Sequence, residues 1–439
     1  MKFFGLSSGP GLQGEISIPG DKSITHRAVI LSALTQGQTT VKNFPLNEDC
    51  LATANAVKKL GIKITLNRAS CQATVFGRRL LGLNRPKGAI CVKESGTTFR
   101  LLLGLLAGQD FGTKLNAGDS LRHRPMLRVI KPLRLMGAQI NSKMIGGEEY
   151  PSIVIRGANL TAITYRLPVA SAQVKSALLL AGLFACGETK VIEPLKTRDH
   201  TERMLKLFKA DLKVRGNTII IKGGKELISP RALYIPADIS SAAFFMVGAN
   251  IIPDSRVLIK KVSLNPSRLG VVKVLNKMGA GLKIKRLKLS GRGNEPTGDI
   301  LASSKILRGV RIKKSEIPSL IDELPILMVA ACLAKGVSVF EGVSELRVKE
   351  TDRIKSMLVN LTKMGAKIKV VKSGKQENII IKGVKGLRAA KVSSFGDHRT
   401  AMSMIIAGLA ASGETYIDNV TCINKSFPAF LKTLNSLNI

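Results

Sequence analysis

One pattern of sequence recurs along the 439-residue chain and limits the folds that it can adopt. An apolar helix end is followed by glycine and then by a β-branched strand. It occurs in "VILSALTQGQTTV" (29–41), "LLLAGLFACGETKV" (178–191), "LMVAACLAKGVSVF" (327–340) and "MIIAGLAASGETYI" (404–417). Glycine suits the left-handed turn in which many helices end. The repetition predicts several copies of one helix–strand unit.

A second pattern lies downstream in the copies. "LRLMGAQI" (133–140), "LNKMGAGLKI" (275–284) and "LTKMGAKIKV" (361–370) are typical of another helix stopped by glycine, followed by a strand. A last strand follows, such as "NTIIIKG" or "ENIIIKG". One unit is therefore predicted as helix, strand, helix, strand, strand, a small α/β subdomain of about 75 residues.

Six such units are predicted. Their first helices are expected to begin near residues 22, 95, 171, 238, 322 and 397. Pro19-Gly20 and Pro236-Ala237 precede the first and fourth units and are typical of chain breaks. The chain is therefore expected to fold as two halves with three units each.

The charge of the chain points to anionic partners. The formal net charge is +38, but lysine and arginine are scattered without a basic block, so we expect most of this charge to be a solvated exterior. Aromatic residues make up 4% and tryptophan is absent, which disfavours stacking platforms for single-stranded nucleic acid. A basic nucleic-acid-binding protein stays open as an alternative of another class.

The six cysteines lie far apart and include no C-x-x-C pair. Zinc and dithiol redox sites are therefore unsupported, and isolated thiols favour a reducing cytoplasm. No apolar segment follows "MKFF", and the longest apolar runs are shorter than the roughly 18 residues of a membrane-spanning helix. We expect a cytoplasmic protein with no metal and no membrane partner.

The six predicted helix starts are rich in Ser, Thr, Asp and Gly. N-capping is the simplest interpretation, since these side chains satisfy free backbone N–H groups. It does not explain the cations near the same starts, where the helix dipole disfavours positive charge. These cations are Lys22, Arg27, Arg100, Lys175 and Arg399. A bound anion would reverse the penalty, so several starts facing one cleft would form a polyanion site.

Six ordered segments resemble the signatures of the 5-enolpyruvylshikimate-3-phosphate synthase family. They are "GDKSITHRAVILSAL", "SGTTFRLLLGLLAG", "GDSLRHRPM", "ASAQVKSALLLAGL", "RVKETDRI" and "GDHRTAMSM", and the resemblance covers essentially the whole chain. It implies an α/β (α+β) fold of two domains, an inside-out barrel of six repeated subdomains. Residues 1–20 and 237–439 would form one domain and residues 21–236 the other.

The resemblance also implies a reaction. The family moves the enolpyruvyl group of phosphoenolpyruvate to the 5-hydroxyl of shikimate 3-phosphate through a tetrahedral ketal, releases phosphate and needs no cofactor. The implied partners are two small anions and no nucleic acid, and we expect a monomer. The related transferase that acts on UDP-N-acetylglucosamine is the nearest alternative. That enzyme typically has Lys-Asn where this chain has Lys22-Ser23, and a cysteine on the loop that reads "GDSLRHRPM" here.

Three residues resemble the catalytic groups of the family. The reaction needs a base for the attacking hydroxyl and an acid for the methylene carbon. Asp322 of "IDELP" resembles the base, and its neighbour Glu323 is the weaker choice because it points elsewhere on the helix. Glu350 of "RVKETDR" resembles the acid, a role that Lys22 could share while contacting both substrates.

The other matched positions imply substrate contacts. For shikimate 3-phosphate they are Lys22, Ser23, Arg27, Ser171, the backbone of Ala172, Gln173, Arg198, Asp322 and Lys349. For phosphoenolpyruvate they are Lys22, Gly96, Arg124, Gln173, Glu350, Arg353, His398, Arg399 and Lys425. Arg198 departs from the family pattern and has a surface cation as its alternative interpretation. His26 is expected to be a helix-surface histidine without a role, and Glu345 replaces an Asn that other members often have.

Overall fold

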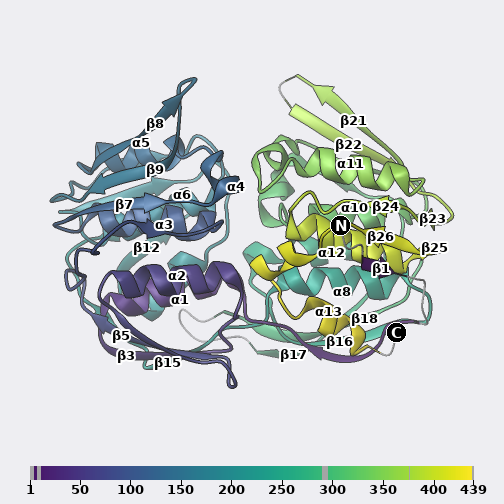
Figure 1. Ribbon diagram of the computed structural model, residues 1–439, viewed down its shortest axis with the longest axis horizontal. Coiled ribbons are helices and arrows are strands. Elements are labelled where there is room, and N and C mark those ends of the chain that lie inside the picture. Colours follow the sequence, from purple (N-terminus) through teal and green to yellow (C-terminus); the bar gives the residue numbers. More distant parts are fainter. Residues whose placement is uncertain (1–3, 7–10, 289–294, 375, 438–439) are drawn as a thin grey trace. The chain divides into compact units, whose positions relative to one another are not determined.

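The computed structural model describes residues 4–6, 11–288, 295–374 and 376–437. The chain forms two compact units (Figure 1). The N-half unit contains residues 20–235 with 290–295, and the C-half unit contains residues 1–19, 236–289 and 296–439.

The N-half unit holds the first three repeats. The first contains α1 (Lys22–Ala33), β3 (Thr35–Lys42), α2 (Glu48–Lys59), β4 (Lys63–Asn67) and β5 (Gln72–Arg78). The second contains β6 (Ile90–Cys91), α3 (Gly96–Ala107), β7 (Gly112–Asn116), α4 (Asp119–Arg122), α5 (Leu127–Leu135), β8 (Gln139–Ile145) and β9 (Glu148–Arg156). The third contains β10 (Thr164–Arg166), α6 (Ala172–Gly182), β11 (Glu188–Ile192), α7 (His200–Leu207), β12 (Asp211–Arg215) and β13 (Thr218–Lys222). The short strands β14 (Leu227–Ile228) and β15 (Ala232–Tyr234) follow.

The C-half unit holds the other three repeats, preceded by β1 (Phe4–Leu6) and β2 (Gln13–Ser17). The fourth repeat contains α8 (Ile239–Ile251), β16 (Arg256–Ser263), the 3-10 helix η1 (Pro266–Arg268), α9 (Gly270–Lys277), β17 (Gly281–Lys288) and β18 (Thr297–Ser303). The fifth contains β19 (Arg311–Ile312), η2 (Lys314–Ser319), α10 (Leu324–Cys332), β20 (Val337–Phe340), η3 (Ser344–Val348), α11 (Arg353–Lys363), β21 (Lys367–Ser373) and β22 (Gln376–Lys382). The sixth contains β23 (Leu387–Arg388), β24 (Lys391–Val392), α12 (His398–Leu409), β25 (Ala411–Ser412), β26 (Thr415–Ile417), η4 (Thr421–Lys425) and α13 (Phe430–Asn435).

The repeats share one sheet topology. The strand after the first helix pairs parallel with a short lead-in strand and antiparallel with the last strand of the repeat, as in the orders β6-β7-β9-β8, β10-β11-β13-β12 and β19-β20-β22-β21. The strand β2 from the N-terminus supplies the parallel partner of β16, and β1 supplies the antiparallel partner of β26. The predicted order of elements is confirmed in the first five repeats, whereas the sixth takes its last strand from the start of the chain.

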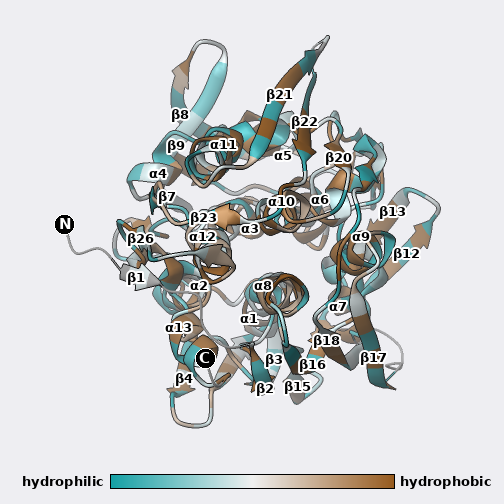
Figure 2. Cartoon of the chain, turned by 90° about the vertical axis from the view of Figure 1, so that its right-hand side faces the viewer, coloured by the Kyte–Doolittle hydropathy of each residue, from teal (hydrophilic) through white to brown (hydrophobic). Residues whose placement is uncertain are grey.

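The first helix of each repeat is buried on nearly all sides. These helices begin at Lys22, Gly96, Ala172, Ile239, Leu324 and His398, within two residues of the predicted positions. α3 packs closely on α6, where a Cβ at Gly104 would lie 2.1 Å from the carbonyl oxygen of Ala177. The strands instead alternate apolar and polar residues, as β21 shows in brown and teal (Figure 2). The predicted α/β class is confirmed.

Candidate active site

Side-chain caps account for the small polar residues at five of the six helix starts. The caps are Asp21, Ser95, Ser171, Asp238 and Asp397, and each accepts a hydrogen bond from a backbone N–H two or three residues ahead. The exception is α10, where Glu323 occupies the cap position without a side-chain cap bond and a proline follows in the first turn. N-capping therefore explains these residues, and the cations need a separate account.

Lys175 does not behave as the helix-start pattern predicted. Its side chain is wholly buried, and its Nζ lies 3.1 Å from Oε1 of Glu193 and 2.6 Å from Oε1 of Glu202. Burial raises the pKa of Glu202, although Lys175 acts against this. The negative charge beside Lys175 therefore comes from two glutamates of the protein, Glu193 and Glu202. The expectation that Lys175 binds an anionic ligand is wrong.

Arg27 carries a charge among neutral partners. Its Nε donates to Thr201 Oγ1 at 2.6 Å, its Nη2 to Ser176 Oγ at 2.7 Å and its Nη1 to the Ser23 carbonyl at 2.6 Å. Burial lowers the pKa of Arg27 to about 10, with Glu202 and Asp21 opposing and Arg198 contributing. The guanidinium therefore stays positive at neutral pH.

The predicted residues beside Arg27 lie on neighbouring segments of the N-half unit. Ser171 caps α6, Ala172 is its first residue, and Arg198 stands partly buried just before α7. The charge of Arg198 acts on Arg27, so these two cations belong to one neighbourhood. The substrate contact of Arg198 stays a prediction.

Lys22 is partly buried at the start of α1 and pairs with Asp49 Oδ2 on α2 at 3.0 Å.

His26, one turn after Lys22, is fully buried, so the prediction of a histidine on the helix surface is wrong. Its Nδ1 lies 2.6 Å from Thr53 Oγ1. Thr53 Oγ1 in turn lies 2.6 Å from Thr98 Oγ1, which links α1 through α2 to α3.

A second group in the N-half unit surrounds the start of α3. A Cβ built on Gly96 would lie 2.9 Å from Nη1 of Arg100 and 2.9 Å from Nη1 of Arg124. Gln173 accepts from Arg100 Nη1 at 2.8 Å and donates to Thr97 Oγ1 at 2.9 Å. The predicted Gly96, Arg124 and Gln173 thus lie together. Arg100 joins them; sequence reasoning placed it among the cations of a polyanion site, whereas the family resemblance assigned it no substrate contact.

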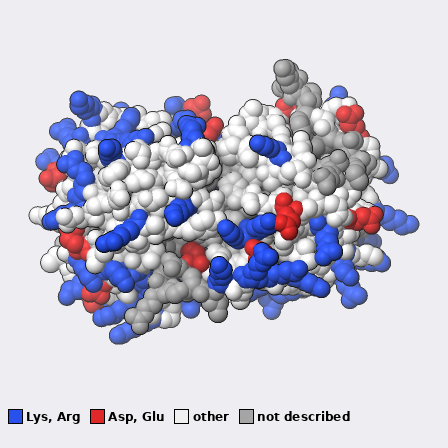
Figure 3. All heavy atoms as spheres, turned by 90° about the horizontal axis from the view of Figure 1, so that it is seen from below, with Lys and Arg blue, Asp and Glu red and all other residues white. Residues whose placement is uncertain are grey.

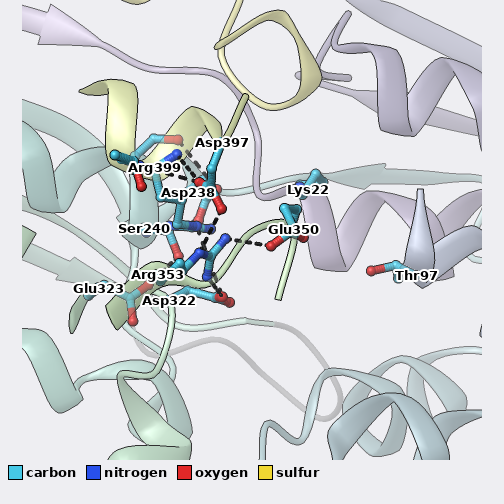
Figure 4. Close-up of polar contacts among 12 residues, drawn as sticks. Lys22, Thr97, Asp238, Ser240, Asp322, Glu323, Glu350, Arg353, Asp397 and Arg399 are labelled. Carbon is cyan, nitrogen blue, oxygen red and sulfur yellow. Dashed lines mark hydrogen bonds and ion pairs between the residues drawn. The ribbon is translucent and has the colours of Figure 1, made fainter. Parts of the chain in front are cut away.

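The C-half unit gathers the predicted acid and base around one guanidinium (Figure 4). Arg353 is buried at the start of α11, and its Nε lies 2.9 Å from Asp397 Oδ2. Its Nη1 lies 3.2 Å from Asp322 Oδ1, and its Nη2 lies 2.6 Å from Glu350 Oε2. Burial alone would lower the pKa of Arg353, but the three carboxylates outweigh it and raise the pKa.

The other predicted residues of this unit adjoin that cluster. Arg399 is buried in the first turn of α12, with Nε 4.0 Å from Asp322 Oδ1, and follows the buried His398. Lys425 donates to the carbonyl of Gly396 at 3.2 Å, just before α12. Lys349 directly precedes Glu350 at the end of η3. The structure therefore brings Asp322, Glu350, Arg353 and Arg399 into contact. His398 and Lys349 are their neighbours along the chain, and Lys425 reaches the loop before α12.

Sequence reasoning missed two partners of these residues. Asp397 both caps α12 and binds Arg353, and only its capping was foreseen. Asp49 pairs with Lys22 without any sequence signal. Glu323 points away from Asp322, as predicted, but it is buried against Arg268 at 3.3 Å.

Two further observations concern the kind of site. Among the described residues, no group of three or more His, Cys, Asp or Glu is arranged to hold a metal ion. No helix in the described part of the chain combines the length and apolar character needed to cross a membrane.

Comparison with known proteins extends over the whole chain. Residues 7–434 match the family model described as EPSP synthase (3-phosphoshikimate 1-carboxyvinyltransferase). The 3-phosphoshikimate 1-carboxyvinyltransferase of Syntrophomonas wolfei is 48% identical over 97% of each chain, and that of Bacillus cytotoxicus is 46% identical over 97% of this chain and 98% of its own. The structure of EPSP synthase from Acinetobacter baumannii aligns with a TM-score of 0.87 and 41% identity, covering 100% of this chain and 98% of the other. The chain therefore belongs to the EPSP synthase family.

Proposed function

We propose that the protein is a 3-phosphoshikimate 1-carboxyvinyltransferase, an enzyme of aromatic amino-acid biosynthesis. It transfers the enolpyruvyl group of phosphoenolpyruvate to the 5-hydroxyl of shikimate 3-phosphate and releases phosphate. The observation that carries the proposal is the pairing of Asp322 and Glu350 with a single guanidinium, Arg353, in a chain of this family.

Shikimate 3-phosphate is bound mainly by the N-half unit. Arg27 and Arg198 are two cations in one neighbourhood, and the groups that hydrogen-bond to Arg27 are neutral, so an anionic ligand suits this part of the unit. Ser23, Ser171, the backbone of Ala172 and Gln173 add polar contacts from the starts of α1 and α6. Lys349, which follows η3, is the remaining residue that the family resemblance assigns to this substrate.

The phosphate of phosphoenolpyruvate is bound near the start of α3. Arg124 and Arg100 both approach Gly96, where a Cβ would lie 2.9 Å from Nη1 of each, so the glycine lets both cations reach the start of α3. The family resemblance assigns further contacts to His398 and Arg399 in the first turn of α12, and to Lys425, which donates to the carbonyl of Gly396. Since the two substrates are anions that repel in water, preplaced cations lower the cost of bringing them together.

The chemistry begins with proton transfer. Asp322 removes the proton of the 5-hydroxyl, whose oxygen attacks C2 of phosphoenolpyruvate, while C3 gains a proton from Glu350. The product of this addition is a tetrahedral ketal that still carries the phosphate. Glu350 then takes a proton back from the new methyl group, and cleavage of the bond between C2 and the phosphate oxygen releases phosphate and restores the enol double bond. Lys22 stabilises the charge that develops at C2 and shares in proton transfer.

Arg353 holds Glu350 in place. Its Nη2 lies 2.6 Å from Glu350 Oε2, so this contact has to loosen before the carboxyl group can reach C3. The carboxylate of phosphoenolpyruvate suits the same planar guanidinium and competes for Nη2. Its arrival frees Glu350 to carry the proton to C3.

The proposal also includes the fold of each unit and the cellular compartment of the protein. Each unit is an inside-out barrel with its three repeats around buried helices, which the packing of α3 on α6 and of α10 on α12 supports. The chain works in the cytoplasm, where its free cysteines stay reduced.

A phosphate-release assay tests the proposed function. Purified protein is mixed with phosphoenolpyruvate and either shikimate 3-phosphate, UDP-N-acetylglucosamine or no acceptor. We expect phosphate release only with shikimate 3-phosphate, and mass spectrometry should detect the carboxyvinyl product. Release with the UDP-sugar alone, or no release with either acceptor, would overturn the proposal.

A further inference from the structure

Glu323 directly follows Asp322 but has a different environment. Its side chain is 0% exposed, and its Oε1 accepts hydrogen bonds from Ser240 Oγ and from Arg268 Nη2, the latter at 3.3 Å. The Arg268 side chain is 2% exposed, donates to Ser240 Oγ and lies 3.7 Å from Asp238 Oδ1. Figure 4 shows Glu323 and Ser240 on the side of the turn away from Glu350. Glu323 is therefore enclosed by the protein and cannot itself reach a substrate.

The cluster joins three segments of the C-half unit. Asp238 and Ser240 stand at the start of α8, Arg268 ends η1, and Glu323 precedes α10. The backbone of Glu323 is fixed as well, because its N–H donates to Leu320 O at 2.9 Å and its carbonyl accepts from Leu327 N at 3.0 Å. The turn that carries Asp322 is thus held by both its backbone and its neighbouring side chain.

A contribution to stability alone does not account for the buried pair of Arg268 and Glu323. Removing two charges from water is costly, and replacing a buried ion pair by apolar residues of similar volume is often neutral or stabilising. Asp322 and Glu323 point in opposite directions, Asp322 toward Arg353 Nη1 at 3.2 Å and Glu323 toward Arg268. Fixing Glu323 consequently fixes the direction of Asp322.

We propose that Arg268 and Glu323 are positioning residues for Asp322. Together they hold the Asp322 carboxylate in line with the 5-hydroxyl of the acceptor. This inference rests on the proposed function, in which Asp322 is the base. A base that is displaced by about 1 Å can lose on the order of 100-fold in rate.

The experiment compares Arg268→Met, Glu323→Met and the double variant by steady-state phosphate release and thermal denaturation. Each single variant should melt at a lower temperature, because Arg268→Met leaves Glu323 without its cation and Glu323→Met leaves Arg268 with Asp238 at 3.7 Å. The double variant should recover most of that loss yet keep a kcat about 10- to 100-fold below that of the unmodified protein. The KM of both substrates should change by no more than about threefold. The exposed pair Lys277–Glu316, changed to Met at both positions, is the matched control and should leave kcat unchanged.

A double-mutant cycle with Asp322→Asn separates the possible outcomes. If Arg268 acts through Asp322, then Arg268→Met should lower kcat little further once Asp322 is Asn. Two outcomes would overturn the positioning role while the proposed function stands. In the first, Arg268→Met lowers kcat by the same factor whether residue 322 is Asp or Asn. In the second, the Arg268→Met/Glu323→Met variant recovers kcat together with its melting temperature. Absence of activity in the unmodified protein would overturn the proposed function itself, and the inference with it.

Discussion

At the scale of single residues, His26 shows the effect of burial most clearly. Burial lowers the pKa of His26 well below 6.5, Lys22 and Arg27 act in the same direction, and Asp21 opposes them. Its Nε2 has no hydrogen-bond partner among the described residues, so a proton there would be unsatisfied. His26 is therefore neutral in the folded protein at neutral pH.

This state predicts a loss of stability in mild acid. Below about pH 6.5 the unfolded chain binds a proton at His26 that the folded chain does not, so the free energy of unfolding falls as the pH falls. The loss is at most about 1.4 kcal/mol per pH unit from this residue. His26→Asn, whose amide can also bond to Thr53, should reduce the loss between pH 7.5 and 5.5 in urea denaturation. Equal losses in both proteins would refute the account of His26.

At the scale of elements, Lys175 ties α6 to both ends of the segment between β11 and α7. Changing Lys175 to Met leaves Glu193 and Glu202 buried without their cation. We expect a loss of about 3–5 kcal/mol in the free energy of unfolding, measured by urea denaturation. The exposed Lys206 of α7, changed to Met, is the control and should cost less than about 0.5 kcal/mol. A similar small cost at Lys175 would show that its ion pairs do not hold these elements together.

Local signals explain why the sequence predicts the elements so well. Each of the six buried helices combines an apolar run with a polar start, and caps such as Asp21 and Ser95 act within three residues of their own position. The partners of buried charges, unlike helix caps, lie far away in the sequence. Arg268 meets Glu323 across 55 residues, and no local pattern marks that meeting.

In the candidate site, too, some residues could be predicted from the sequence and others could not. The family resemblance selected Asp322, Glu350 and Arg353, and the structure brings these three together. It did not select Asp397, because the capping role of this residue is sufficient to explain its place in the sequence. The sequence did not reveal that His26 is buried, because it lies in the same helix start as the charged residues Lys22 and Arg27.

At the scale of the whole molecule, positive charge dominates the surface. The chain has 68 lysine and arginine residues and 30 aspartate and glutamate residues, and cations are spread over the face seen in Figure 3. Such a surface raises the local concentration of anionic substrates. We infer a kinetic role for this charge.

Salt should therefore slow substrate capture more than chemistry. Raising the ionic strength from about 0.02 M to 0.5 M shortens the Debye length severalfold, so kcat/KM for phosphoenolpyruvate should fall by about tenfold or more. The value of kcat at saturating substrate should change little. A kcat/KM that is constant across this range, measured by initial-rate phosphate release, would rule out steering by the surface charge.

The central claim is that Asp322 and Glu350, held on Arg353, supply the base and the acid. The most direct measurement is the initial rate of phosphate release by Asp322→Asn and Glu350→Gln, with circular dichroism to show that each variant is folded and Glu341→Gln as a surface control. The account predicts a loss of about 100- to 10,000-fold in kcat for both variants and none for the control. Folded variants that release phosphate within a few-fold of the unmodified rate would contradict it.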